Sequence, residues 1–296
     1  CLDRSIEKLI KNDHVCIDEE GRKWFKSTAF GDTDDRVVVR DNGVKTYFAA
    51  DIAYHDEKIE RGYDLCIDVW GAEHHGYIPR VKGALEALGH DPNRLEILLY
   101  QFVRLVRGGQ PVRMSTRAGE FELLSDLVRE VGKDATRYIF AMRKSDAQCD
   151  FDLELATSQS MDNPVYYVQY GHARICQIIA KGLESGHSVP SVENVDLSPL
   201  VLDEEIMLIK KALQYPWVIR SAAEAREVHF LPIYLQELNS MFHAYYTRYK
   251  HTEKVVTDDR AKTSARLFMC ECLRIVLANA LDLLGVEAPE RMYFSA

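Results

Sequence analysis

The sequence lacks a hydrophobic run long enough to cross a membrane, and its cysteines follow no recognisable pattern. The longest apolar runs, around residues 95–106 and 273–284, fall well short of the roughly 20 residues that a membrane-spanning helix needs. No signal-like segment opens the chain. Seven cysteines, an odd number without a CxxC pair, form neither a disulfide framework nor a zinc pattern. We therefore expect a cytoplasmic protein that makes no contact with a membrane.

The chain also lacks the positive charge of a protein that coats nucleic acid. Its formal net charge is -9, so we expect no general binding to DNA. Residues 101–144 are the exception, because they hold nine Lys and Arg against five Asp and Glu. Such a basic zone inside an acidic protein suits local docking of a polyanion, although a solvated helix face explains it nearly as well.

The most distinctive stretch, residues 103–119, places four arginines, three glycines and a Ser-Thr pair around one predicted turn. Gly108 and Gly109 supply the positive φ of a tight hairpin turn between an extended apolar run and a return that starts at Pro111. The polar segment 113–117 follows. Its guanidinium and hydroxyl groups could grip a triphosphate and neutralise a pyrophosphate leaving group. A solvated basic hairpin is the alternative.

A candidate ligand pocket comes earlier in the chain. The pattern predicts a hairpin that returns as a strand at 46–50, with a helix starting at Asp51. Tyr47 and Asp51 are then four residues apart across a strand-to-helix junction and can point into one pocket. A carboxylate beside a tyrosine suits a guanidinium or ammonium ligand. A simple helix N-cap next to a core tyrosine is the alternative.

Residues 65–70 are the clearest strand, a nearly continuous apolar run typical of a buried parallel sheet. The strand ends in a glycine turn and polar cluster at 71–76, and a helix follows at 77–88, so the segment forms half of a nucleotide-binding βα unit. Glu73 in this turn is placed to accept a hydrogen bond from a ribose hydroxyl. The adjacent histidines 74 and 75 diverge on a helix and have no third ligand nearby, so we expect no metal site.

From residue 123 onward the pattern is helical. The expected features are two short helices at 121–131 and 133–143, a loop at 184–199 and a long amphipathic helix at 232–250. A final helix begins after the capping segment 257–259, Thr-Asp-Asp, and is stopped by Gly285 and Pro289. The apolar stripes of these helices predict the core of a helix bundle.

These motifs occur in an order and spacing that resemble bacterial arginyl-tRNA synthetases over essentially all 296 residues. Segment 113–117, Arg-Met-Ser-Thr-Arg, resembles the KMSKS signature loop of class I aminoacyl-tRNA synthetases, with Arg113 in place of the first lysine. The other matching segments are Tyr-Phe-Ala-Ala-Asp-Ile-Ala-Tyr-His at 47–55, Trp-Gly-Ala-Glu-His-His-Gly-Tyr at 70–77, Asp-Phe-Asp-Leu at 150–153 and Asn-Pro-Val-Tyr-Tyr-Val-Gln-Tyr-Gly-His-Ala-Arg at 163–174.

The resemblance implies a role for each matching residue. The contacts to the substrate L-arginine would be Tyr47, Asp51 and His74. The ATP-binding residues would be Gly71, Glu73 and Met114, with Glu73 in place of the family's more frequent Asp. The catalytic loop over the ATP phosphates would be formed by Arg113, Ser115, Thr116 and Arg117. The contacts to the anticodon bases of arginine tRNA would be Tyr170, Arg174 and Met292. No residue would act as a covalent nucleophile, because such enzymes work by positioning the reactants and stabilising charge.

The implied architecture is an α/β, partial Rossmann-like catalytic domain followed by an all-α anticodon-binding helical bundle. We expect the first at 1–120, a helical connector at 121–160 and the bundle at 161–296. The implied ligands are ATP, as a substrate with Mg²⁺, L-arginine and arginine tRNA. We expect no metal bound by the protein itself and a monomer as the oligomeric state.

One family signature is absent. The HIGH-type motif that grips ATP near the first strand of this fold is not found, and the sequence starts with Cys1 rather than methionine. We therefore expect the C-terminal portion of a synthetase, unable to form arginyl-adenylate alone. Two alternatives stay open: a non-catalytic tRNA-binding module derived from a class I synthetase, and a class I relative that charges another amino acid. The second would be distinguished by whether Tyr47 and Asp51 bind a guanidinium.

Overall fold

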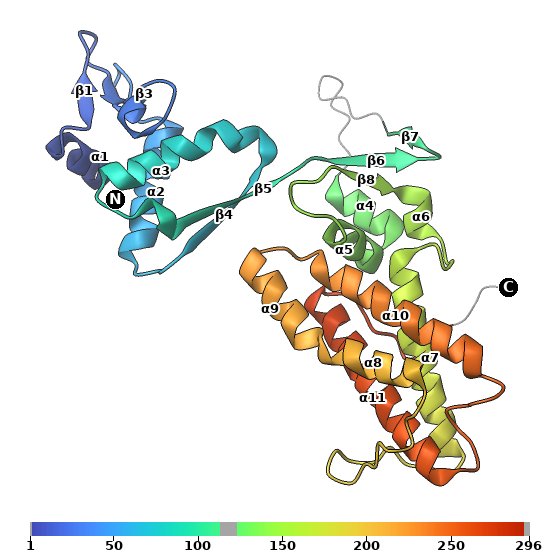
Figure 1. The fold of residues 1–296 in the computed structure, drawn as a ribbon. Coiled ribbons are helices and arrows are strands. Elements are labelled where there is room, and N and C mark those ends of the chain that lie inside the picture. Colours follow the sequence, from blue (N-terminus) through green and yellow to red (C-terminus); the bar gives the residue numbers. More distant parts are fainter. Residues whose placement is uncertain (1, 113–122, 293–296) are drawn as a thin grey trace. The chain divides into compact units, whose positions relative to one another are not determined.

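The computed structural model describes residues 2–112 and 123–292. Contacts within the chain divide it into two compact units, Cys1–Phe102 and Val103–Ala296. Figure 1 traces the chain through the mixed first unit and the mainly helical second unit. Among the described residues, no helix is both long and apolar enough to span a lipid bilayer.

Within residues 2–102, two small sheets combine with three α-helices. The strands are β1 Val15–Ile17, β2 Lys23–Phe25, β3 Arg36–Val39, β4 Cys66–Gly71 and β5 Leu95–Tyr100. The α-helices are α1 Leu2–Lys11, α2 Tyr47–Glu60 and α3 Ile78–Ala87. Short 3-10 turns occupy Ser27–Phe30, Ala72–Tyr77 and Pro92–Arg94. Strands β1, β2 and β3 form an antiparallel sheet, whereas β4 and β5 pair in parallel.

Strand β4, helix α3 and strand β5 form a βαβ unit, with Cys66 opposite Leu95 in the parallel register. Helix α3 provides the crossover that parallel strands need, and its Leu85 is buried with both of these residues in one core cluster. The predicted strand ahead of the glycine turn is confirmed. The prediction that it is buried is half right, because side chains alternate between the two faces of a strand. Ile67 and Val69 point away from the core and are 42% and 64% exposed.

The strand predicted at 46–50 is wrong, because these residues begin helix α2. The Thr46 side chain accepts a hydrogen bond from the Ala49 backbone N–H and so caps the helix. Phe48, Ala49 and Ile52 are buried at helical rather than strand spacing. Asp51 therefore lies one turn inside the helix and is not its cap. Since residues four apart share one face of a helix, Tyr47 and Asp51 still lie on the same side.

The second unit contains a small sheet and a helical bundle. Its strands are β6 Val103–Arg107, β7 Gln110–Pro111 and β8 Cys149–Asp152. Its described helices are α4 Leu124–Val131, α5 Lys133–Ala141, α6 Leu153–Thr157, α7 Pro164–Glu184, α8 Asp203–Leu213, α9 Tyr215–Ala225, α10 Phe230–Tyr249 and α11 Arg260–Leu283. The predicted hairpin is confirmed, since β6 and β7 pair antiparallel and Gly108 and Gly109 between them have φ values of 56° and 73°.

The bundle core contains a fully buried arginine. Arg266 of α11 has no exposed surface, and its Nε lies 2.6 Å from Oε1 of Glu205, which is also fully buried. The same guanidinium donates to the Glu253 carboxylate at 2.9 Å and to the Lys254 carbonyl oxygen at 2.8 Å. Because a buried charge is costly unless it is paired, these bonds fix α8 and the segment before α11 against each other. The predicted capping segment 257–259 is confirmed, and within it Asp259 caps α11 by accepting from the Lys262 N–H.

Candidate functional site

A cleft of about 550 Å³ opens between one face of α2, from Tyr47 to Lys58, and strand β4 with the turn that follows it. Tyr47 and Asp51 line it from α2, and Trp70, His74 and Tyr77 line it from the end of β4 and the 3-10 turn that follows. The cleft thus brings together the three residues that the sequence suggested for arginine binding. Tyr47 is 93% exposed, so its ring stands open to a ligand.

The Asp51 carboxylate is held by a tyrosine that the sequence reasoning did not single out. Tyr77 donates its hydroxyl proton to Oδ2 of Asp51 at 2.7 Å. Burial raises the pKa of Tyr77, and the negative charge of Asp51 raises it further, so the hydroxyl keeps its proton at neutral pH. The carboxylate has several lone pairs and can accept further hydrogen bonds from a cationic ligand.

A second carboxylate, Asp68 of β4, lies deeper in the cleft wall. Its oxygens lie 2.6 Å from His55 Nε2 and 2.7 Å from Lys58 Nζ. Burial alone would raise the pKa of Asp68, but these two partners hold it below its usual value. His55 Nδ1 is 2.7 Å from the backbone oxygen of Asp51, so this network ties β4 to the turn of α2 that carries Asp51. The only sequence signal for this network was Asp68 itself, an acidic residue inside an apolar strand.

Gly71 and Glu73 lie at the rim, where β4 passes into the 3-10 turn. A side chain at Gly71 would collide with Glu73, since a Cβ there would lie 2.2 Å from Glu73 Oε2. Glycine therefore leaves room for the Glu73 carboxylate, whose Oε1 is 3.5 Å from His74 Nε2. Both Glu73 and His74 are exposed, so each can reach a polar ligand at the mouth of the cleft.

If the cleft binds L-arginine, as the resemblance implies, Tyr77→Phe should weaken that binding by about fivefold, because it removes one hydrogen bond that orients Asp51, worth about 1 kcal/mol. Isothermal titration calorimetry measures the change. Tyr63→Phe, at an exposed tyrosine of the same unit, is the control. If both variants bind equally well, Tyr77 does not position Asp51 for this ligand.

A second candidate site lies on the helical unit, where α7 contacts α10. Arg174 stacks over the ring of Tyr170 with its Cζ 4.5 Å from the ring centroid, and its Nη2 donates to the Tyr170 hydroxyl. His243 of α10 stacks on Tyr170, with ring centroids 5.7 Å apart and planes within 18°. Arg174 also lies 5.1 Å from the ring of Tyr246. The sequence motif predicts Tyr170 and Arg174 but carries no signal for the two aromatic partners on α10.

Gly171 allows the two helices to approach this closely. A Cβ at this position would lie 1.5 Å from the Asn239 side-chain oxygen, so any larger residue would displace the buried Asn239 amide. Asn239 in turn donates to the Tyr167 carbonyl oxygen at 2.8 Å. Met292 lies three residues beyond Pro289, whose carbonyl oxygen is 2.9 Å from His172 Nδ1 on α7. The segment that carries Met292 therefore approaches α7 beside Gly171.

His243 is held in its neutral form. Burial, and then the positive charge of Arg174, lower its pKa to about 4. Its Nδ1 lies 3.1 Å from Arg174 Nη1, which can only donate, so Nδ1 accepts. The ring proton then resides on Nε2, which is buried and has no hydrogen-bond partner within the described structure.

We expect the protein to lose stability as the pH falls from 6.5 towards 4, partly through His243. In this range the unfolded chain binds a proton on this imidazole whereas the folded chain does not, so acid favours unfolding. The contribution is about 1 kcal/mol near pH 5.5. Urea unfolding at pH 7.5 and 5.5 should therefore show a smaller loss for His243→Gln than for the parent chain. The same loss in both proteins would contradict a neutral, buried His243.

The predicted loop residues Arg113, Met114, Ser115, Thr116 and Arg117 lie outside the described residues. Within residues 2–112 and 123–292, no group of three or more His, Cys, Asp and Glu side chains is arranged to hold a metal ion.

A parallel βα unit with a polar cleft at its strand end, followed in the chain by a helical bundle, fits a class I aminoacyl-tRNA synthetase, and the family comparisons identify the class. Residues 2–177 match the family of class I (R) tRNA synthetase catalytic domains, and residues 168–292 match the DALR anticodon-binding domain. The chain belongs to the arginyl-tRNA synthetase family.

Several arginine–tRNA ligases and solved structures are similar to nearly the whole of this chain. The arginine–tRNA ligase of Syntrophotalea carbinolica is 51% identical over 284 residues, which are 96% of this chain and 50% of that protein. The arginine–tRNA ligase of Desulforamulus reducens is 50% identical over 291 residues, 98% of this chain and 51% of that protein. A solved structure from Campylobacter jejuni, assigned as an arginyl-tRNA synthetase, has a TM-score of 0.88 at 39% identity and covers 98% of this chain and 62% of its own. The chain thus spans about half the length of the curated relatives it matches.

Proposed function

We propose that this chain forms part of a cytosolic arginine–tRNA ligase, which uses MgATP as a substrate to attach L-arginine to its tRNA and releases AMP and pyrophosphate. The observation that carries this proposal is the cleft at the end of β4, where the Asp51 carboxylate, oriented by Tyr77, stands beside the exposed ring of Tyr47. The relatives at about 50% identity, named arginine–tRNA ligases, support the same function.

The cleft suits a guanidinium. A planar cation with several N–H donors pairs best with a fixed carboxylate, and an aromatic face adds a cation-π contact. Asp51 and Tyr47 offer these two groups from one face of α2, and His74 adds a polar contact at the rim. Asp68 lies in the same wall, but the Lys58 ammonium compensates its charge and its oxygens are engaged by His55 and Lys58, so Asp51 is the carboxylate that remains for the ligand.

ATP would bind where β4 ends. A glycine turn at a strand's carboxyl end is the usual place for a nucleotide in an open α/β sheet. Gly71 and Glu73 would hold the ribose and adenine together with Met114. Activation of arginine would need no covalent nucleophile from the protein, because the amino-acid carboxylate itself attacks the α-phosphate when the two are held in line. This step forms arginyl-adenylate and releases pyrophosphate, and the terminal adenosine of the tRNA then accepts the arginyl group and releases AMP.

The loop residues would act on the triphosphate. The two guanidiniums of Arg113 and Arg117 would neutralise the charge that builds on the leaving pyrophosphate, and the hydroxyls of Ser115 and Thr116 would hydrogen-bond its oxygens. Arg113 offers a planar fork where the family's signature begins with a lysine, so its hydrogen bonds to phosphate would differ in geometry.

We place the catalytic part at residues 1–120, a connector at 121–160 and the anticodon-binding part at 161–296. Tyr170 and Arg174 would hold an unstacked anticodon base by stacking, and Met292 would contact a neighbouring base. The match of residues 168–292 to the DALR anticodon-binding domain supports this assignment.

We expect Arg174→Ala to weaken the binding of arginine tRNA to this chain by about tenfold, because it removes both a cation and a stacking surface. Fluorescence anisotropy in one fixed salt measures the affinity, since phosphate contacts make binding strongly dependent on salt. Arg220→Ala, which removes an exposed arginine from α9, is the matched control. An unchanged affinity for Arg174→Ala, beside an unchanged control, would remove Arg174 from the tRNA site.

A further inference from the structure

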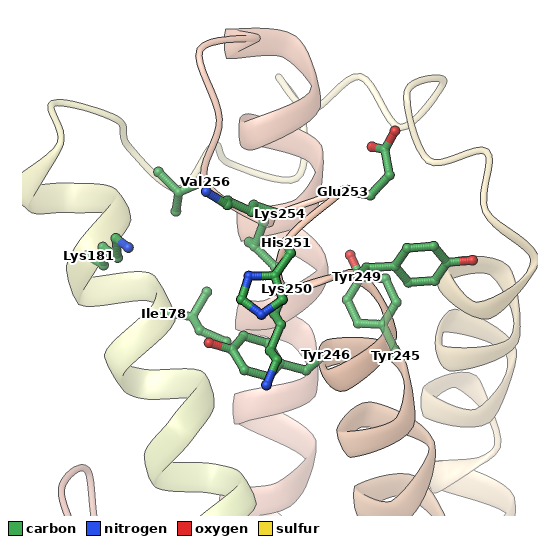
Figure 2. Close-up of a pocket in the computed structure, with 11 residues that line it drawn as sticks. Ile178, Lys181, Tyr245, Tyr246, Tyr249, Lys250, His251, Glu253, Lys254 and Val256 are labelled. Atoms are coloured by element: carbon green, nitrogen blue, oxygen red, sulfur yellow. The ribbon is translucent and has the colours of Figure 1, made fainter.

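A pocket of about 230 Å³ lies where α7, α10 and the segment after α10 meet. Figure 2 shows Lys181 of α7 on one side of the pocket, Tyr245 and Tyr249 on the other, and Lys250 and His251 between them. These residues belong to neither cluster that the proposed function uses. The pocket combines cations with aromatic rings, so it can contact both an anionic group and a planar apolar group.

The pocket is positively charged. Lys181, Lys250 and Lys254 are exposed, and none of them forms a salt bridge within the described part of the chain. The one carboxylate in the lining, Glu253, is already paired with Lys262 at 3.1 Å and with Arg266 at 2.9 Å. Three lysines are therefore available to an anion, and no carboxylate in the lining is left to repel it.

The pocket is also preformed, because hydrogen bonds within the chain hold its backbone in place. Arg266, fully buried and bound to Glu205, donates to the Lys254 carbonyl oxygen and to the Glu253 carboxylate. Tyr249 donates its hydroxyl to Glu204 at 2.9 Å. The segment that carries Lys250 and Lys254 is thus anchored to the bundle core. Binding of a ligand therefore costs little conformational entropy in this backbone.

The pocket continues from the Tyr170–Arg174 cluster. Tyr246 lines the pocket and at the same time lies 5.1 Å from the guanidinium of Arg174. Ile178, which also lines the pocket, follows Arg174 by four residues on α7, about one helical turn or ~5.4 Å along the axis. A ligand that occupies the Tyr170–Arg174 cluster could therefore extend into the pocket.

We propose that this pocket binds a second nucleotide of the same single-stranded RNA segment, next to the one held by Tyr170 and Arg174. Its phosphate lies on Lys181 and Lys250, and its base packs against Tyr246. An apolar cavity of about 150 Å³ accepts a benzene molecule, so the volume of this pocket suffices for a nucleobase. Base stacking with phosphate contacts is the general way in which proteins hold unpaired RNA. The proposal rests on the proposed function, because it requires that the helical unit binds the anticodon loop.

The test measures binding of arginine tRNA to the chain across a series of salt concentrations. We expect Lys181→Ala combined with Lys250→Ala to lower the affinity about tenfold. The slope of log K against log salt should fall by about 0.7 for each phosphate that the variant no longer neutralises. Lys210→Ala, at an exposed lysine of α8, is the control and should change the slope much less. Tyr246→Leu should weaken binding about tenfold with an unchanged slope, and Tyr246→Phe should restore it.

Two results would overturn the proposal in distinguishable ways. If the parent chain discriminates against a tRNA with a changed central anticodon base, but the double lysine variant binds like Lys210→Ala, the proposed function stands and the pocket does not bind RNA. If the parent chain does not discriminate between the two tRNAs, the proposed function fails and the pocket proposal fails with it. Circular dichroism of each variant establishes that the loss of binding is not a loss of fold.

Discussion

Asp51→Asn should weaken the binding of L-arginine to this chain by about 100-fold, roughly 2–3 kcal/mol. The substitution keeps the size of the side chain but removes the charge that pairs with a guanidinium. Tyr77 would still reach the amide oxygen, so the fold around the cleft should be preserved. Asp64→Asn, at an exposed aspartate between α2 and β4, changes the net charge equally and is the matched control. Calorimetric titration with L-arginine gives both affinities.

The same experiment distinguishes arginine from other substrates. L-citrulline has nearly the shape of L-arginine without its charge, so the parent chain should bind it far more weakly. In Asp51→Asn the difference in affinity between the two ligands should be smaller. If Asp51→Asn binds L-arginine as tightly as Asp64→Asn does, Asp51 is not the group that pairs with the guanidinium.

Arg266→Ala should destabilise the helical unit by about 3–5 kcal/mol. The change leaves the fully buried Glu205 without its cationic partner and releases the segment that Arg266 holds through Glu253 and the Lys254 carbonyl oxygen. Urea unfolding followed by circular dichroism at 222 nm measures the loss, because most of the described helix lies in this unit.

Arg220→Ala is the control for stability as well. It removes an exposed ion pair with Glu224 four residues away, and such pairs contribute only about 0.3–0.5 kcal/mol. Replacing Arg266 and Glu205 together by Met and Leu should recover most of the lost stability, because no unpaired charge then remains in the core. Equal unfolding midpoints for Arg266→Ala and Arg220→Ala would contradict a structural role for the buried pair.

The sequence predicted most of the elements because their signals are local. The apolar strand before Gly71, the turn at Gly108 and Gly109, and the cap at Asp259 each depend on a few neighbouring residues. The error at 46–50 arises where the local signal is ambiguous. Thr46 can end a strand or cap a helix, and only the burial of Phe48 and Ile52 against the core decides in favour of the helix.

The residues of the two sites were harder to predict from the sequence than the helices and strands were. Spacing alone suggested that Tyr47 and Asp51 act together, and they do lie on one wall of the cleft. Tyr77, which orients Asp51 from 26 residues away, could not be assigned by spacing. His243 contacts Arg174 across 69 residues, and nothing in the helical pattern distinguishes it from a core histidine. Partners that meet only through tertiary packing carry no signal in a single sequence.

The most direct test of the ligase proposal compares the binding of arginine tRNA to this chain with the binding of the same tRNA carrying a changed central anticodon base. Both affinities are measured at one salt concentration, so that the phosphate contacts contribute equally to the two values. We predict that the base change weakens binding by about tenfold or more, which is roughly 1.4 kcal/mol. Equal affinities would contradict an anticodon-reading site at Tyr170 and Arg174 and would favour a non-catalytic module that binds tRNA by charge alone.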